Sequence, residues 1–169
     1  MNLKLVPLTD GHRTPVIGIL NHYVVNSDAA FFETPLPEAA FDRLRALAEG
    51  FPAFAVLDGA ERVVGFGLMR PHQPLPTFSR VAETSYFLHP DCCRCGAGSR
   101  LLTRLLEEGA QRGITTVLAS IVASNEASLR FHRKHGFTEC GRFRAVLHKQ
   151  GRDLDVVWMQ KMLSAVDPL

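Results

Sequence analysis

A strand, a turn containing glycines and a long amphipathic helix follow one another between residues 80 and 113, and a second apolar strand comes directly after them. The helix, residues 97–112, carries leucines at three- and four-residue spacing, and Gly113 marks its end. Residues 114–123 are apolar and β-branched enough for a buried strand. Strands joined by a helical crossover lie parallel in one sheet, so the pattern predicts a βαβ unit with its helix on one sheet face.

Hairpin patterns flank this unit on both sides. Residues 53–57 and 63–69 are apolar runs joined by Asp58-Gly59, and residues 137–147 and 154–162 form a similar pair with His148 to Asp153 between them. After the first pair, Pro71, Pro74 and Pro76 lack the amide donor of a central strand, so they predict a loop.

The remaining elements are shorter. Leu3 to Pro7 alternate like a strand, residues 14–25 and 39–48 have helical spacing with a loop over 27–37 between them, and Asn125 can cap a helix that runs to His135. The sum is an α/β (α+β) fold with a mixed, mostly antiparallel sheet of about seven strands and helices on both faces. At 169 residues, we expect one domain over 1–169.

Composition narrows the function classes. A formal charge of +2 with scattered basic residues lacks the electrostatic footprint of a nucleic-acid binder, so no nucleic acid is expected as a partner. The start, MNLKLVPLTD, has no leader pattern and no apolar stretch reaches about 18 residues, so we expect no membrane partner and a cytoplasmic protein.

Cysteines crowd the end of the strand, at Cys92, Cys93 and Cys95, too close in sequence to pair easily with one another. With His89 they form a His-x-x-Cys-Cys-x-Cys run, and thiolate and imidazole suit zinc. The spacing matches none of the usual structural zinc patterns, so we expect reduced thiols and no metal.

The turn before the long helix reads Cys93-Arg94-Cys95-Gly96-Ala97-Gly98-Ser99. A helix amino terminus presents unpaired amides and partial positive charge, and glycines let a phosphate approach the backbone, so the turn suits a phosphorylated ligand. Glycines here can also merely satisfy a tight turn. The Gly-Lys-Ser/Thr of a Walker loop and the third glycine of a dinucleotide fingerprint are both missing, which disfavours nucleotide hydrolysis and hydride transfer.

These residues resemble the coenzyme A loop of the GNAT acetyltransferase superfamily, Arg/Gln-x-x-Gly-x-Gly/Ala at a strand-to-helix turn. The chain is most similar to the phosphinothricin and methionine sulfone N-acetyltransferase branch. The resemblance extends over nearly the whole chain, through Phe32-Glu33-Thr34, Ala82-Glu83-Thr84-Ser85-Tyr86-Phe87-Leu88-His89-Pro90, Ser124-Asn125-Glu126-Ala127-Ser128-Leu129, Phe131-His132, Lys134-His135-Gly136-Phe137 and Gly151-Arg152.

The resemblance implies acetyl-CoA as cosubstrate. Backbone amides from Arg94 to Ser99 would hold its diphosphate, and the amide of Leu88 would polarise the acetyl carbonyl. Cys93 stands where the family has Arg or Gln, so side-chain help at that position is lost, unless Arg94 compensates. The full set of coenzyme residues implied is Tyr86, Phe87, Leu88, Arg94, Cys95, Gly96, Ala97, Gly98, Ser99, Asn125, Ser128 and Lys134.

Two residues match the family's catalytic positions. Attack on a thioester needs a neutral amine, yet amines are mostly charged at neutral pH, so a base is required. Glu83 matches the family's base, acting directly or through water, although a glutamate merely paired on a strand is the alternative. His132 stands where many members have Tyr and is the expected proton donor to the thiolate, although a helical histidine can also be structural.

The acceptor side departs from the family. The resemblance implies Phe32, Gln73, Leu75 and Phe78 as substrate-binding residues. Members acting on phosphinothricin-like amino acids have basic residues and a tyrosine in the proline-rich loop, where this chain has Gln73, Leu75 and Phe78. Losing those cations removes charge-assisted hydrogen bonds worth about 1.5–3 kcal/mol each, which disfavours phosphinothricin itself. Arg70, His72 and Arg80 lie nearby and could rebuild an anion site.

The resemblance therefore implies an N-acetyltransferase that moves acetyl from acetyl-CoA to the primary amine of a small molecule, an amino acid or an analogue. Acetylation of a polyamine or of a protein N-terminus is a rival within the same class. A catalytically idle acyl-CoA-binding module is a rival from another class, favoured by Cys93 and by the altered loop. Members of the branch are commonly dimers, so a homodimer is expected.

Overall fold

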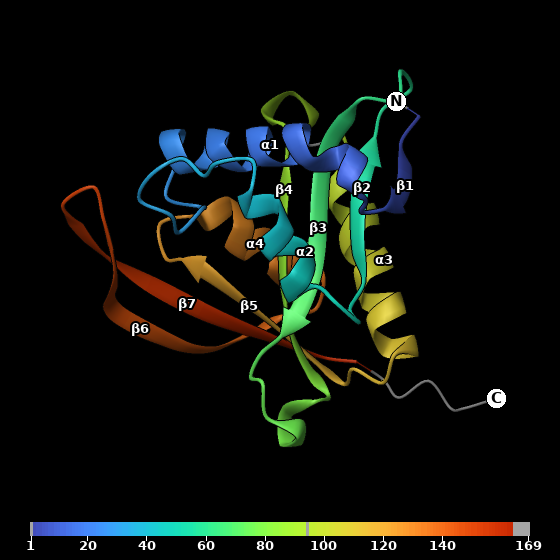
Figure 1. Ribbon diagram of the computed structural model, residues 1–169. Coiled ribbons are helices and arrows are strands. Elements are labelled where there is room, and N and C mark those ends of the chain that lie inside the picture. The colour runs from blue at the N-terminus through green and yellow to red at the C-terminus, as the bar shows by residue number, and fades with distance from the viewer. Residues whose placement is uncertain (1, 94, 164–169) are drawn as a thin grey trace.

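Seven strands form one sheet in the computed structural model, which describes residues 2–93 and 95–163. Their spatial order is β1-β2-β3-β4-β5-β7-β6 (Figure 1). The strands are β1 (Lys4–Pro7), β2 (Ala53–Leu57), β3 (Val63–Pro71), β4 (Val81–Leu88), β5 (Thr116–Val122), β6 (Thr138–Lys149) and β7 (Arg152–Met162). The longer helices are α1 (Arg13–Asn26), α2 (Ala40–Leu47), α3 (Ala97–Gln111) and α4 (Glu126–Lys134).

Only β4 and β5 pair in parallel, and α3 is the crossover between them; every other neighbouring pair among the described strands is antiparallel. This arrangement confirms the predicted βαβ unit, the two hairpins and the mixed, mostly antiparallel sheet. The element types expected from the sequence are all present, with ends that differ by one or two residues in most cases.

Helices cover both faces of the sheet because the strands alternate their apolar side chains between two cores. Phe54 and Val56 of β2 pack into the core under α3 and α4, while Ala55 between them packs with α1 and α2. In Figure 1, α1 and α2 cross the near face and α3 lies behind the sheet. Within the described residues, none of the helices is both long and apolar enough to cross a membrane.

Two predicted boundaries were wrong. The expected connection from His148 to Asp153 is mostly strand, because His148 pairs with Asp153 and Lys149 pairs with Arg152, which leaves a two-residue turn at Gln150 and Gly151. Both turn residues have positive φ, the geometry that matches the twist of a tight hairpin. Pro71 was expected in a loop, but it closes β3 opposite Ala82, at the strand end, where a missing amide is tolerated.

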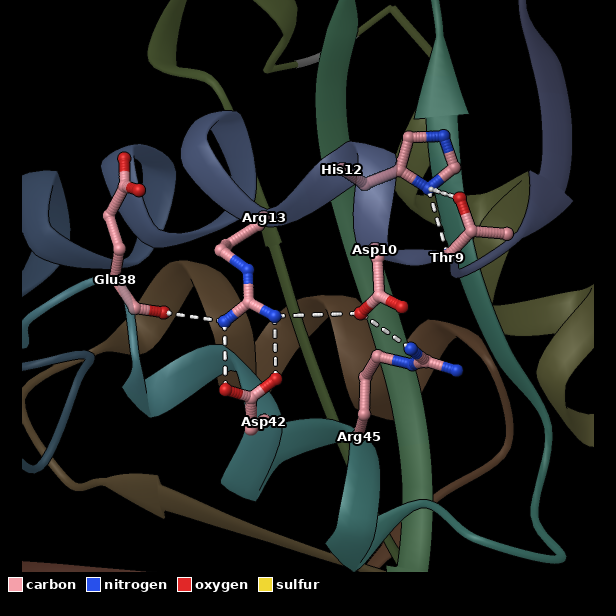
Figure 2. A network of polar contacts seen from close by, with 7 residues as sticks. All are labelled: Thr9, Asp10, His12, Arg13, Glu38, Asp42 and Arg45. Carbon is pink, nitrogen blue, oxygen red and sulfur yellow. Dashed lines mark hydrogen bonds and ion pairs between the residues drawn. The ribbon is translucent and has the colours of Figure 1, made fainter.

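Ion pairs join the start of α1 to α2 (Figure 2). Arg13 makes a bidentate contact with Asp42, at 2.9 and 2.6 Å, and one of its amino groups lies 3.4 Å from the carbonyl oxygen of Glu38. Asp10, just before α1, binds Arg45 of α2 at 2.6 Å. These contacts hold α2 under α1, and so fix the front layer that covers β3 and β4.

Candidate active site

The sheet opens between β4 and β5. Register pairs join the two described strands at three positions only, ending at Glu83 opposite Leu118, although β4 continues to Leu88 and β5 to Val122. Beyond Glu83 the strands diverge, and the polar groups that would otherwise form a ladder face the gap. A split sheet of this kind is where a ligand can reach the backbone.

The peptide groups of β4 alternate between its two neighbours. Val81 O accepts from His72 N on the β3 side, whereas Arg80 O accepts from Thr115 N on the β5 side. By this alternation the amides of Thr84, Tyr86 and Leu88 face the gap. Leu88 O on the same edge accepts a hydrogen bond of 2.7 Å from the Tyr23 hydroxyl of α1, so Tyr23 fixes the strand end whose amide was predicted to polarise the acetyl carbonyl.

A cavity of about 490 Å³ occupies this gap. Side chains from both faces of the sheet line it, and most of its wall is apolar. Eight of the predicted site residues contribute to it: Phe32, Tyr86, Phe87, Leu88, Gly98, Asn125, Ser128 and His132. Among the described residues, the remaining predictions lie outside the lining: Glu83, Cys95, Gly96, Ala97, Ser99, Lys134, Gln73, Leu75 and Phe78.

The turn that opens α3 lies at one end of the cavity. Gly96 has φ +84°, a left-handed conformation that costs a residue with a Cβ about 1–2 kcal/mol. Within the described part of the chain, the amides of Gly96, Ala97, Gly98 and Ser99 meet no acceptor, and the first bond into the helix runs from Arg100 N to Gly96 O. The predicted contribution of Arg94 lies outside the described residues.

Asn125 caps α4 and also lines the cavity. Its Oδ1 accepts from Ser128 N at 3.1 Å, which satisfies one of the free amides of the helix. The cap uses the oxygen, so the Nδ2 amino group is left to donate to a ligand in the cavity that Asn125 lines.

Tyr86 and His132 form a buried pair between β4 and α4. The Tyr86 hydroxyl lies 2.7 Å from His132 Nε2, and His132 Nδ1 lies 2.8 Å from the carbonyl oxygen of Ser128. A carbonyl can only accept, so Nδ1 carries the proton and Nε2 accepts from Tyr86. Burial lowers the pKa of His132 and raises that of Tyr86, so both side chains stay neutral at pH 7.

Two side chains hold Glu83: Arg70 of β3, and His72, which follows β3 directly. Oε2 accepts from Arg70 Nη2 at 2.6 Å and from Arg70 Nε at 3.2 Å, while Oε1 lies 2.7 Å from His72 Nδ1. Glu83 and Arg70 stand directly opposite each other in the β3–β4 ladder. Arg70 lines the cavity and Glu83 does not, so Arg70 connects Glu83 to the cavity wall.

Aromatic side chains from the loop after α1 form part of the cavity wall. Phe31 and Phe32 line the cavity and are 38% and 43% exposed, which is unusual for large apolar side chains unless something covers them. Their loop is fastened to the β6–β7 hairpin, because Lys149, fully buried, donates to Ser27 O at 2.7 Å and to Ala30 O at 2.8 Å.

The predicted acceptor loop lies farther out. Gln73, Leu75 and Phe78 are exposed. Phe78 contacts His72, one of the partners of Glu83, with the two ring centroids 5.9 Å apart. The short helix Pro76–Phe78 forms within this loop. Arg80, which was expected to help bind an anion, is exposed too, and it lines no part of the cavity.

The cysteine cluster does not converge on one point. Cys93 Sγ lies 3.8 Å from His89 O and 3.8 Å from the Tyr23 hydroxyl, whereas Cys95 Sγ lies 2.8 Å from Cys92 O. Within residues 2–93 and 95–163, no three His, Cys, Asp or Glu side chains come together as a metal-ligand set. Cys93 does line the cavity, a position that was not predicted.

The split between β4 and β5 lies beside a glycine turn and a helix amino terminus, and the resemblance placed the coenzyme at this turn. The model of the Acetyltransferase (GNAT) family matches residues 21–137, more than half of the chain. The chain belongs to the GNAT acetyltransferase family.

Relatives of this GNAT protein act on amino-acid analogues. It is 33% identical over 150 residues to an L-methionine sulfoximine/L-methionine sulfone acetyltransferase of Pseudomonas paraeruginosa, covering 86% of each chain. It is 31% identical over 153 residues to a phosphinothricin N-acetyltransferase of Streptomyces coelicolor, covering 88% of this chain and 90% of that one. A phosphinothricin acetyltransferase from Sinorhizobium meliloti in complex with acetyl-CoA superposes with a TM-score of 0.91 at 26% identity, over 100% of this chain and 94% of the other.

Sequence patterns alone did not show how Arg70, Glu83 and His72 fit together in this GNAT protein. All three had been singled out, but their contact depends on the register of β3 against β4 and on the fold of the loop after Pro71, which no local pattern fixes. Tyr23 was assigned only to the apolar face of α1. Its hydroxyl bond to Leu88 joins residues 65 positions apart in the chain.

Proposed function

We propose that the protein transfers the acetyl group of acetyl-CoA to the primary amine of a small molecule of the amino-acid type. The observation that carries the proposal is the split between β4 and β5 beside the start of α3, where the amides of Gly96 to Ser99 meet no acceptor among the described residues. The named activities of the relatives, acetylation of methionine sulfone and of phosphinothricin, support the reaction class. The acetyl-CoA complex of the Sinorhizobium meliloti enzyme supports the cosubstrate.

Acetyl-CoA would enter between β4 and β5 with its diphosphate on the amides of Gly96 to Ser99, aided by the partial positive charge of the helix end. Its pantetheine arm would use the ladder positions that β4 leaves open, and Asn125 and Ser128 line the same passage. The amide of Leu88 would then stabilise the oxyanion that forms as the amine attacks.

The reaction releases two protons from a charged amine. The first must leave before attack, and Glu83, which Arg70 joins to the cavity wall, is the predicted base. The second can pass to the departing thiolate, because a thiol with a reference pKa near 8.5 accepts it readily from the acetylated ammonium.

His132 remains the predicted donor to the thiolate. In the tautomer described here its Nε2 has no proton, so a donor role would require prior protonation, which burial opposes. Tyr86, whose hydroxyl proton lies between the two side chains, would share that role.

The acceptor side favours a molecule with an apolar part. Phe31, Phe32 and Phe87 line the cavity, whereas the basic residues of phosphinothricin-binding relatives are replaced at Gln73 and Leu75. Arg70 is already paired with Glu83, so a substrate carboxylate would have to share it.

We propose further that the protein is a cytoplasmic homodimer. Edge strand β6 carries exposed Phe143 and Val146, 55% and 59% accessible, next to a register irregularity between residues 143 and 147. Exposed apolar side chains on a long edge strand invite pairing with a second copy. The four free cysteines suit a reducing compartment, which supports the cytoplasm.

The test is to incubate the protein with acetyl-CoA and a panel containing L-methionine sulfone, L-phenylalanine and spermidine, while free thiol release is followed. We expect release with at least one amino acid and a mass increase of one acetyl group on that acceptor. Tight acetyl-CoA binding without release for any amine would instead indicate an idle coenzyme-binding module.

A further inference from the structure

We propose that His72, oriented by Glu83, is the group that takes the proton from the acceptor amine, and that Glu83 acts through it. This inference rests on the proposed acetyltransferase function and assigns a catalytic residue to its first step. It starts from the contacts of one carboxylate with an arginine and an imidazole.

Both oxygens of Glu83 are already engaged. Arg70 donates twice to Oε2, and His72 Nδ1 lies 2.7 Å from Oε1. A further proton donor would have to share an oxygen with one of these partners. Glu83 is also only 12% exposed, against 26% for His72, and both of its oxygens are occupied, so an incoming amine would have to displace one of its partners to reach it.

His72 has the free nitrogen that Glu83 lacks. Because an ionised carboxylate only accepts, the His72 Nδ1 must carry the proton, which leaves Nε2 as an acceptor. Within the described residues Nε2 has no hydrogen-bond partner, and 26% of the side chain is exposed. Histidine is the side-chain type that changes charge near neutral pH, as a base for an amine requires.

His72 lies outside the cavity lining, as Glu83 does, but its neighbours connect it to the cavity. The ring centroid of Trp158 lies 6.0 Å from that of His72, and Trp158 is the register partner of Ser120, which lines the cavity. On the other side, Arg70 is two residues away in sequence and lines the same cavity floor. Among the described residues, the groups in contact with the ring are Glu83, Phe78 and Trp158, and the charged side chain next to them is Arg70, which binds Glu83.

Protons and bonds balance without another reactant. The ammonium group of the acceptor gives one proton to His72 Nε2, and Glu83 stabilises the imidazolium that results. The neutral amine forms a bond to the acetyl carbon, the bond from carbon to sulfur breaks, and the thiolate takes the second amine proton. His72 then returns its proton to solvent. Arg70 holds the carboxylate of Glu83 in place through two hydrogen bonds.

Three variants test the assignment, with L-methionine sulfone, L-phenylalanine or spermidine as acceptor, whichever the wild type uses fastest. His72→Gln should lower kcat/KM by roughly 10² to 10⁴ without changing acetyl-CoA affinity. Glu83→Gln should also lower it, because the imidazolium that forms loses its carboxylate partner. His148→Gln is the matched control: His148 lies 2.7 Å from Asp153 at the far hairpin, and its loss should leave the rate unchanged.

A second measurement is independent of turnover. In protein labelled with nitrogen-15 at histidine, the wild type at pH 8 should show His72 with its proton on Nδ1, identified by the signal that His72→Gln removes. Retention of at least a third of the wild-type rate by His72→Gln, or a His72 proton on Nε2, would overturn the assignment. Absence of turnover with all three amines despite acetyl-CoA binding would overturn the proposed function and the proton-acceptor role together.

Discussion

Glu83 is the last residue of β4 that pairs with β5, and the sheet divides beyond it. Its position follows from strand geometry: one residue farther along β4, the side chain would face α3 instead of the α1 side. Arg70 stands directly across from it and supplies the opposite charge, which is the favourable cross-strand arrangement. The two hydrogen bonds from Arg70 therefore hold the carboxylate in one orientation beside the cavity.

Removal of this charge should slow the reaction rather than weaken coenzyme binding. For Glu83→Gln we expect turnover to fall by roughly 10² to 10⁴ at neutral pH, with acetyl-CoA affinity nearly intact, because the proton of the amine loses its acceptor system. Steady-state kinetics and calorimetric titration measure the two effects. Glu107→Gln, on the exposed face of α3, is the control, and equal turnover of the two variants would remove Glu83 from the mechanism.

His132 should make stability depend on pH. Burial lowers its pKa in the folded protein, so the unfolded chain binds a proton first as pH falls below about 6.5, and folding loses stability from there down to the folded pKa. Urea unfolding at pH 7 and pH 5 should show a larger loss for the wild type than for His132→Gln. At pH 7 the variant should be less stable by about 1 kcal/mol, because the hydroxyl of Tyr86 loses its acceptor. Identical pH dependence of the two proteins would contradict this.

At the scale of elements, local patterns were enough for most of the fold. Three- and four-residue spacing marked α1, α2 and α3, and the possible cap at Asn125 marked α4. Proline and glycine marked helix ends and the loops between strands. The β6–β7 turn was placed too wide because His148 and Asp153 are polar, like loop residues, yet pair across the hairpin. The divergence of β4 from β5 has no local signal at all, since both strands look continuous in sequence.

In the candidate site, too, local motifs predicted individual residues but not the contacts between elements. Residues carried by one motif, such as Gly98 and Asn125, could be named from the sequence and line the cavity. Contacts between elements could not, because they depend on register and on distant segments meeting, as with Tyr23 and Leu88 or Lys149 and Ala30. The aromatic wall was predicted only at Phe32 and not at Phe31.

The turn before α3 needs glycine at one position in particular. Gly96→Ala leaves room for the methyl group, since nothing lies within 4 Å, but the left-handed φ of +84° is costly with a Cβ. We expect the turn to rearrange and acetyl-CoA to bind up to about tenfold more weakly, as about 1.4 kcal/mol implies. Gly59→Ala, where the added methyl is also free of contacts and φ is not positive, should bind as the wild type does. Unaltered affinity in Gly96→Ala would show that this turn does not hold the coenzyme.

Lys149 should stabilise the loop that forms the aromatic wall. Lys149→Met keeps the apolar stem but leaves the carbonyls of Ser27 and Ala30 without their charged donor, which costs about 1.5–3 kcal/mol of folding stability. Thermal or urea unfolding measures the loss, and KM for the amine should rise several-fold while acetyl-CoA affinity stays the same. Lys4→Met, on a side chain that is 62% exposed, is the control. Equal stability of both variants would contradict the role given to Lys149.

At the scale of the whole molecule, the β6–β7 hairpin extends away from the rest of the sheet (Figure 1). It exposes Phe143 and Val146 on the edge strand and carries Lys149 near its turn. A second copy paired along β6 would cover the apolar side chains and stiffen the hairpin that supports Phe31 and Phe32. Dimerisation and acceptor binding would then depend on the same element.

This arrangement can be measured by light scattering after size exclusion. We expect the wild type at twice the chain mass of 18.7 kDa and Phe143→Asp at the chain mass, because a charge on the apolar edge opposes pairing. Leu47→Asp, on an exposed residue of α2, is the matched control and should remain dimeric. A wild type that elutes as a monomer at micromolar concentration would contradict the proposed dimer.

Every functional inference depends on a coenzyme A thioester lying in the gap between β4 and β5 with its diphosphate at the start of α3. Crystals soaked with acetyl-CoA test this most directly. The account predicts diphosphate oxygens within hydrogen-bond distance of the amides of Gly96 to Ser99 and the acetyl group beside Leu88. A diphosphate bound elsewhere, or amides at the α3 turn that face inward and are already paired, would contradict it.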